Sequence, residues 1–318
     1  MYTTLLITGI VAGIYIIVYN VFIKRQRCKS STTLHGKTAI VTGANTGIGK
    51  ATALELAKRG ARVILACRSQ ERAEAAVRDI KRESGNAEVV YMQLDLASLQ
   101  SVRSFAETFL KTEPRLDLLI NNAGLFVEGK TEDGFGMIFG VNHLGHFLLT
   151  LLLLERLKEC GSSRVINVSS KAYNFGAIDF NYLSTHKELG LGGSGYRLFK
   201  LYGHSKLCNV LFTHELAKRL QGTSVTCYSL HPGPVKTEIA RHTSIWWKTF
   251  LIPTSWLFFV DPDSGAQTTL HCALQEGIEP LSGRYFSDCV EEEVLPKAKD
   301  DAVARKLWEV SERLSGLS

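Results

Sequence analysis

The feature that most constrains this chain is a glycine-rich turn between a short apolar run and an amphipathic segment. Residues 38–42 read Thr-Ala-Ile-Val-Thr, and residues 43–50 read Gly-Ala-Asn-Thr-Gly-Ile-Gly-Lys. The apolar run predicts a buried strand, and the segment after the turn predicts a helix that continues to Arg59. Such a turn lets the backbone approach a pyrophosphate, while the helix N-terminus adds N–H donors and a positive dipole end. The residues predicted to hold a phosphate here are Gly43, Asn45, Thr46, Gly47, Ile48 and Gly49.

Short apolar strands and helical segments alternate along the rest of the chain. Further strands are predicted at residues 62–66, 88–94, 116–120, 164–168 and 224–230. Further helices are predicted to end near residue 84 and to cover about 98–111, 135–158 and 202–220. This alternation is typical of βαβ units, so we expect an α/β fold with a Rossmann-type, doubly wound parallel sheet. A short polar linker covers residues 30–36, and no later linker splits the chain, so residues 30–318 are predicted to hold a single domain.

Charge and cysteine content exclude several classes of protein. The chain of 318 residues has a net charge of +6, of which residues 24–29 carry +4. The remainder is nearly neutral, which argues against nucleic-acid binding. The seven cysteines are scattered and odd in number, which favours a reducing compartment over a disulfide framework. Neither a CxxC nor an HExxH spacing indicates a metal site.

The N-terminal segment has the length and composition of a membrane anchor. Residues 1–23 carry no charged side chain, and the 19 residues 5–23 are mostly apolar. As a helix they would extend about 28 Å, enough to cross the hydrocarbon core. The basic cluster follows this span, so the positive-inside rule places the body in the cytosol and makes residues 1–29 a single-pass anchor. The alternative is a cleaved signal peptide and a secreted protein, but the segment lacks a basic n-region.

The end of the second strand indicates which dinucleotide would bind. In this fold an acidic residue at that position holds the adenosine ribose 2′-hydroxyl. Here the position is Cys67, and Arg68 follows it. A missing acid beside an arginine favours a 2′-phosphate, so the predicted cofactor is NADP(H).

Polar side chains at the ends of later strands predict a site for carbonyl chemistry. Asn121 begins an Asn-Asn-Ala-Gly turn after the fourth strand, and Ser170 follows the fifth. Tyr202 and Lys206 lie at i and i+4, so they share one face of a helix. A phenol is a weak acid at neutral pH, and a nearby ammonium lowers its pKa. A proton donor at Tyr202, with Ser170 as a second donor, suits a carbonyl substrate.

A second tyrosine–lysine pair, Tyr196 and Lys200, has the same spacing. It follows a run of glycines at 190–195, whereas Tyr202 begins an amphipathic helix with Ser205 and Asn209 as polar neighbours. We therefore prefer Tyr202.

Taken in order, the motifs TGxxxGxG, NNAG, the strand-five serine, YxxSK and the Pro-Gly turn at 231–237 resemble those of the short-chain dehydrogenase/reductase family, over about residues 36–290. The strings LACRSQERAEAA, VNHLGHFLLT and HSKLCNVLFTHELAKRL are similar to its retinol dehydrogenase branch.

The resemblance implies that Tyr202 is the general acid/base, that Lys206 lowers its pKa and holds the nicotinamide ribose, and that Ser170 polarises the substrate carbonyl. It implies further cofactor or relay roles for these residues: Asn142 in a proton relay with Lys206, Asp95 at the adenine, Asn121 at the adenosine ribose, and Val235 and Thr237 at the nicotinamide amide. The separation of Ser170 from Tyr202 by 32 residues is longer than in compact members of the family.

The expected substrate is lipophilic. The segment at about 238–262, which the family uses as a substrate lid, contains three of the four tryptophans. The resemblance implies a membrane-bound oxidoreductase of the endoplasmic reticulum acting on retinal/retinol or a similar aldehyde. The alternatives are a steroid or xenobiotic carbonyl reductase and a non-catalytic cofactor-binding protein. A homodimer is left open. His143 and His146 are predicted to be packed inside the fold or to support the site indirectly.

Overall fold

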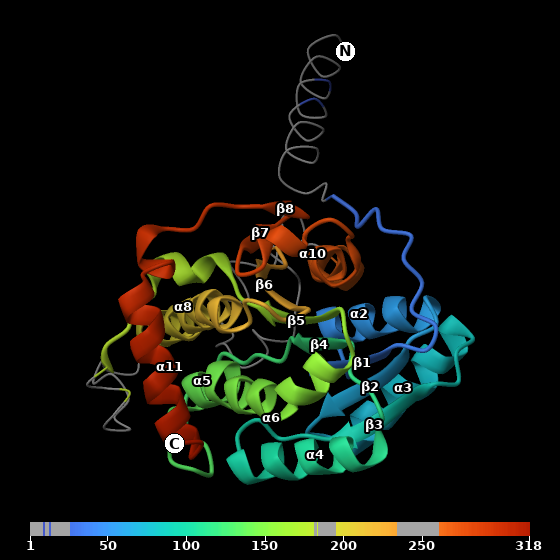
Figure 1. Cartoon of the computed structure of the whole chain (residues 1–318), viewed down its shortest axis with the longest axis horizontal. Helices are drawn as coiled ribbons and strands as arrows, with labels where there is room; N and C mark the ends of the chain where they lie inside the picture. The colour runs from blue at the N-terminus through green and yellow to red at the C-terminus, as the bar shows by residue number, and fades with distance from the viewer. Residues whose placement is uncertain (1–8, 10–12, 14–25, 181–182, 184–194, 234–260) are drawn as a thin grey trace.

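The computed structural model describes residues 26–180, 195–233 and 261–318, with Gly9, Gly13 and Leu183. Within these residues an eight-stranded sheet has the order β3-β2-β1-β4-β5-β6-β7-β8 (Figure 1). All neighbouring strands pair in parallel except β7 and β8, which are antiparallel. The strands are β1 (Thr38–Thr42), β2 (Arg62–Cys67), β3 (Val89–Gln93), β4 (Leu118–Asn121), β5 (Ser163–Val168), β6 (Val225–His231), β7 (Tyr285–Ser287) and β8 (Val290–Glu291).

Helices cover both faces of this sheet because successive strand residues point to opposite sides. Val41 packs into the core formed with α2 (Gly47–Lys58), α3 (Gln70–Ser84) and α10 (Pro262–Leu274). Its neighbour Ile40 packs into the opposite core, which contains side chains from α4, α6, α8 and α11. The bounds of these helices are α4 (Leu99–Thr112), α6 (Gly145–Glu159), α8 (Gly195–Arg219) and α11 (Asp301–Ser315). The prediction of a single α/β domain with a mostly parallel sheet is confirmed.

Two predicted helices differ from those in the structure. The helix expected at 135–158 is composite, because α5 (Met137–Phe139) leads into a π-helical turn, η2 (Gly140–Leu144), before α6. The helix expected at 202–220 begins earlier, at Gly195 in α8. Both tyrosine–lysine pairs therefore lie on one helix. The short strands β7 and β8 and the helices α10 and α11 were not predicted.

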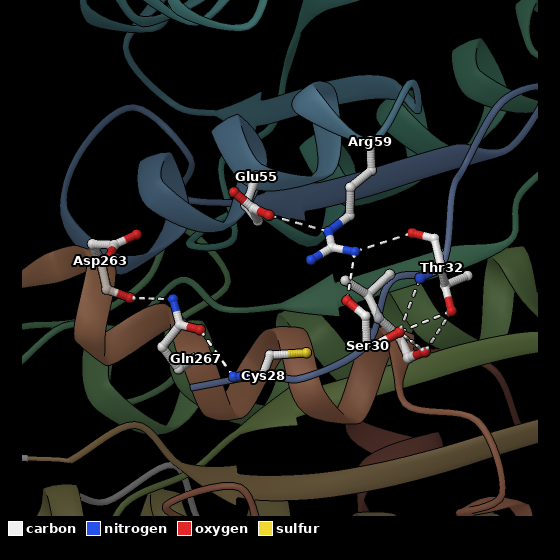
Figure 2. A network of polar contacts seen from close by, with 8 residues as sticks. Cys28, Ser30, Thr32, Glu55, Arg59, Asp263 and Gln267 are labelled. Atoms are coloured by element: carbon white, nitrogen blue, oxygen red, sulfur yellow. Dashed lines mark hydrogen bonds and ion pairs between the residues drawn. The ribbon is translucent and has the colours of Figure 1, made fainter. Parts of the chain in front are cut away.

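Residues 26–32 pack against the domain and do not form a free linker. The Cys28 amide donates to Gln267 Oε1 of α10 at 3.1 Å (Figure 2). The Ser30 hydroxyl donates to the Leu274 carbonyl at 2.8 Å. Arg59, the C-cap residue of α2, donates from Nη1 to the carbonyls of Ser30 and Thr32 at 2.8 and 3.1 Å (Figure 2). We call residues 26–32 the strap. The prediction that residues 30–36 form a linker was therefore wrong for its first residues.

One described helical stretch, Met137–Glu159, is long and apolar enough to cross a membrane, but 72% of its apolar stretch is buried. It packs against α4 and the sheet and is a core helix of the domain. Almost all of the predicted anchor at 5–23, apart from Gly9 and Gly13, and almost all of the predicted lid at 238–262 lie outside the described residues.

Candidate active site

The glycine-rich loop joins β1 to α2 and is held close to the turn that follows β4. Gly43 and Gly47 have φ angles of +65° and +57°, which L side chains rarely adopt. A Cβ atom on Gly43 would lie 3.0 Å from the Cα of Ala123, and one on Gly49 would lie 2.5 Å from Asn122 Nδ2. These glycines therefore allow the two turns to pack against each other at the carboxyl edge of the sheet.

The N-terminus of α2 offers backbone donors to an anion. Thr46 is its N-cap residue, and its side chain makes no capping hydrogen bond with any described residue. The first turn also contains no acidic residue. The first N–H groups of a helix have no partner inside the helix, so these donors can hold a phosphate. Asn45, Thr46 and Gly47 are partly exposed at this position, while Ile48 is buried beneath it.

The end of β2 presents a buried thiol and an exposed cation. Cys67 contacts the backbone of Gly43, Ala44 and Asn45, and burial raises the pKa of its thiol to about 11. Cys67 therefore packs beneath the loop as a neutral side chain. Arg68 is exposed and makes no ion pair or hydrogen bond within the part of the chain that the structure describes. Its guanidinium is available to an anionic ligand.

The structure separates the roles of the two predicted adenosine contacts. Asp95 is partly exposed after β3, where its Oδ1 accepts a hydrogen bond from the Ala97 amide at 2.9 Å. Asn121 is only 2% exposed. Its Nδ2 donates to Thr150 Oγ1 at 3.0 Å and to Asn167 Oδ1 at 2.8 Å. The amide nitrogen of Asn121 thus holds β4 to β5 and α6, while its buried Oδ1 has no hydrogen-bond partner among the described residues.

Ser170, Tyr202 and Lys206 come together at the carboxyl edge of β5. The Ser170 and Tyr202 side chains share a hydrogen bond. Lys206 is 2% exposed, and its Nζ donates to the Val168 carbonyl at 3.0 Å. Ser169 has a different role, because its hydroxyl donates to the Lys206 carbonyl at 2.7 Å and fixes α8 to β5. Of the two serines, Ser170 is therefore the one whose side chain meets Tyr202.

The alternative pair is directed to solvent. Tyr196 is 66% exposed, and Lys200 Nζ lies 4.9 Å from the centroid of its ring. Tyr196 and Tyr202 are six residues apart on α8, so they point to different sides of the helix. Tyr196 does not share the Ser170 contact that Tyr202 makes.

Burial shifts the two titrating groups of the site in opposite directions. It raises the pKa of Tyr202 to about 12, an effect that the hydrogen bond with Ser170 opposes. It lowers the pKa of Lys206 to about 8. The expected lowering of the Tyr202 pKa by Lys206 is therefore not found in the protein alone. The geometry explains this: Lys206 gives its hydrogen bond to Val168 and lies beside the phenol ring, with Nζ 5.4 Å from its centroid.

Asn142 lies in the π-helical turn η2 and is fully buried. Its side chain bonds both backbone groups of Leu125, at 2.9 Å to the amide and 3.1 Å to the carbonyl. Its Nδ2 also donates to Ser205 Oγ at 3.1 Å. Asn142 thus connects the segment after β4 to α8, one residue from Lys206.

Thr42 contributes to the site but was not selected from the sequence. Its Oγ1 accepts hydrogen bonds from the amides of Asn122 and Ala123, both at 2.9 Å. This hydroxyl fixes the turn after β4 against the glycine-rich loop. The sequence did contain a signal for this role, because Thr42 directly precedes Gly43 at the end of the strand that lies next to β4. Val235 and Thr237 lie outside the described residues.

Comparisons with known proteins show which proteins this chain is similar to. A family model described as "short chain dehydrogenase" matches residues 37–188. The human protein "Dehydrogenase/reductase SDR family member 13" is 54% identical over 319 residues, covering 100% of this chain and 83% of that protein. Human "Retinol dehydrogenase 14" is 51% identical and covers 89% of this chain and 88% of its own. A crystal structure of an uncharacterised protein of Mycobacterium paratuberculosis is 34% identical, with a TM-score of 0.72, and covers 92% of this chain and 98% of its own.

Proposed function

Because this chain belongs to the short-chain dehydrogenase/reductase family, in its retinol dehydrogenase-like branch, we propose that it transfers hydride between NADP(H) and a lipophilic aldehyde or alcohol. Oxidoreductase activity on alcohol or carbonyl groups follows from the family. The observation that carries the proposal is the convergence of Ser170, Tyr202 and Lys206 at the carboxyl edge of β5. This is the edge where open α/β sheets bind their ligands.

The protein's own residues supply the proton chemistry. With its pKa near 12, Tyr202 is protonated at neutral pH and can act as an acid. In the reductive direction Tyr202 would give its O–H proton to the carbonyl oxygen, and the chemistry that bound NADPH would supply is a hydride for the carbonyl carbon. The aldehyde thereby becomes an alcohol. Ser170, which shares a hydrogen bond with Tyr202, holds the same oxygen as a second donor. Lys206, with a pKa near 8, is mainly charged at neutral pH and stabilises the phenolate that remains.

The residues around the loop fit an NADP(H) cofactor. The α2 N-terminus offers free amides to the pyrophosphate, and Gly43, Gly47 and Gly49 let the backbone approach it. Cys67 replaces the acid that would hold a ribose 2′-hydroxyl, and the exposed Arg68 can pair with a 2′-phosphate. We assign Asp95 to the adenine and Val235 and Thr237 to the nicotinamide amide.

The relatives and the sequence also support a proposal for the substrate class and for the location of the protein. Relatives named retinol dehydrogenase are about half identical to this chain, which supports a retinal/retinol-like substrate. The apolar segment 5–23 and the aromatic segment 245–260 are consistent with a substrate taken from a bilayer. We propose a single-pass protein of the endoplasmic reticulum membrane with its catalytic domain in the cytosol.

A substrate and cofactor panel tests this proposal. The full chain, in detergent micelles, would be assayed with NADPH and with NADH against all-trans-retinal, a long-chain aldehyde, a steroid ketone and a small water-soluble aldehyde. We expect the highest kcat/KM with NADPH and a lipophilic aldehyde. Preference for the steroid ketone would reassign the substrate, and the absence of turnover with every pair would contradict an enzymatic role.

A further inference from the structure

A buried chain of hydrogen bonds runs from the glycine-rich loop to the catalytic helix through His146. Thr42 Oγ1 lies 2.9 Å from His146 Nε2, and His146 Nδ1 lies 3.2 Å from the Asn142 carbonyl oxygen. Asn142 Nδ2 donates to Ser205 Oγ at 3.1 Å, and Ser205 Oγ donates to the Tyr202 carbonyl at 2.8 Å. Four consecutive contacts therefore link the loop to the helical turn that carries Tyr202.

The direction of the first contact follows from the bonds of Thr42. A hydroxyl has two acceptor positions and one hydrogen to donate. The amides of Asn122 and Ala123 fill the acceptor positions, both at 2.9 Å. The hydrogen can go to the Ile120 carbonyl at 3.4 Å or to His146 Nε2 at 2.9 Å. The shorter contact is the better hydrogen bond, so Thr42 donates to His146.

The tautomer of His146 follows from this direction. Because Nε2 accepts the Thr42 hydrogen, the ring proton of a neutral His146 lies on Nδ1, from which it is donated to the Asn142 carbonyl. The ring is 3% exposed, and burial lowers its pKa to about 3. The neighbouring Lys206 and His143 lower it further. His146 is therefore neutral, and each bond of the chain has one direction.

We propose that His146 is a positioning residue whose Nδ1–H tautomer fixes the Asn142 carbonyl and couples the glycine-rich loop to the turn that carries Tyr202. The effect on turnover rests on the proposed function, whereas the tautomer does not. The location agrees with this role, because Asn142 lies in the π-helical turn η2, and such turns are frequent at functional sites. His143, three residues earlier, has a different partner, since its Nε2 lies 3.0 Å from Ser311 Oγ on α11.

Nuclear magnetic resonance tests the tautomer without any assay of activity. The full chain, labelled with ¹⁵N-histidine and held in detergent micelles, would give ring signals whose couplings show which nitrogen carries the proton. The signal lost in His146→Gln identifies His146. We expect an Nδ1–H tautomer that does not titrate between about pH 5 and pH 8. An Nε2–H tautomer, or titration in that range, would overturn the proposal even if the enzyme were active.

Kinetics test the coupling. We expect His146→Leu to lower kcat on the order of tenfold while the KM for NADPH changes by less than about twofold, because the loop is retained and Tyr202 is displaced. His146→Asn places an amide donor near the position of Nδ1 and should recover part of the loss. Tyr228→Phe is the control, since it removes another buried hydrogen bond, to the Ile278 carbonyl at 3.0 Å, remote from these residues. Equal losses of kcat in His146→Leu and Tyr228→Phe, or no recovery in His146→Asn, would contradict the coupling.

Discussion

Lys206 Nζ lies 5.4 Å from the centroid of the Tyr202 ring, so the ammonium lies beside the phenol that it is expected to serve. The hydrogen bond of Lys206 goes instead to the carbonyl of Val168, which also accepts from Asn209 Nδ2 at 3.3 Å. The end of the strand therefore positions the cation beside the phenol ring, and in the proposed reaction this cation would stabilise the phenolate through space. This arrangement leaves the phenol oxygen to its hydrogen bond with Ser170.

Tyr202→Phe should lower kcat by at least about a hundredfold, because it removes the proton donor together with its hydrogen bond to Ser170. Binding of NADPH, measured by fluorescence quenching, should change little. Tyr196→Phe is the matched control on the same helix, since its ring is 66% exposed and its loss should be tolerated. Activity in Tyr202→Phe together with inactivity in Tyr196→Phe would show that the wrong tyrosine was chosen.

The lowered pKa of Lys206 predicts a dependence of stability on pH. Its folded pKa is about 8, below the ordinary 10.5, so the unfolded chain binds more protons between these values. Where the unfolded state binds more protons, the free energy of unfolding rises with pH. Lys206 should therefore make the free energy of unfolding rise with pH above pH 8. One proton contributes at most about 1.4 kcal/mol per pH unit. Urea unfolding of the full chain and of Lys206→Met at pH 8 and 9.5 isolates this term. An equal rise in both proteins would refute the assignment.

Arg68→Ala should weaken the binding of NADPH on the order of tenfold, because one charge-assisted contact to a phosphate is lost. The binding of NADH should stay nearly unchanged. Lys81→Ala provides the control, since Lys81 is an exposed cation at the far end of α3. Dissociation constants from calorimetry decide the result. Equal affinities of the unmodified protein for the two cofactors would remove the basis for preferring NADP(H).

The convergence of the site was predictable because it follows from local rules. Ser170 follows a parallel strand, and Tyr202 and Lys206 share a helix face. All three side chains can therefore reach the same edge of the sheet. The π-helical turn around Asn142 was not predictable, because it involves contacts with Leu125, which lies 17 residues away, and with Ser205. The buried role of the Asn121 side chain likewise depends on Thr150 and Asn167 in other elements.

The strap was misread for the same reason. Ser30 and Thr32 are small polar residues of the kind that form linkers, and their partner, the Leu274 carbonyl, lies more than 240 residues away. A window of local sequence contains no sign of that partner. Strands β7 and β8 have only three and two residues, too few to show the alternation that identifies a strand.

The strap predicts where the proposed anchor can be removed without damage to the domain. Deleting residues 1–25 should release the protein from membranes, because it removes the proposed span but keeps the bonds of Cys28, Ser30 and Thr32. Deleting residues 1–32 should release it equally but lower the free energy of unfolding by about 2–4 kcal/mol, since several partly buried hydrogen bonds to α2 and α10 are lost.

Arg59→Ala in the full chain separates these two effects. It removes the two hydrogen bonds that this C-cap residue of α2 gives to the strap but leaves residues 1–25 in place, so the protein should stay on membranes and lose stability. Lys58→Ala, an exposed neighbour on the same helix, is the control and should change neither property. Membrane flotation and urea unfolding measure the two properties. Release of Arg59→Ala from membranes would mean that the strap, and not residues 1–25, carries the attachment, and equal stability of the two truncations would mean that the strap adds nothing to the fold.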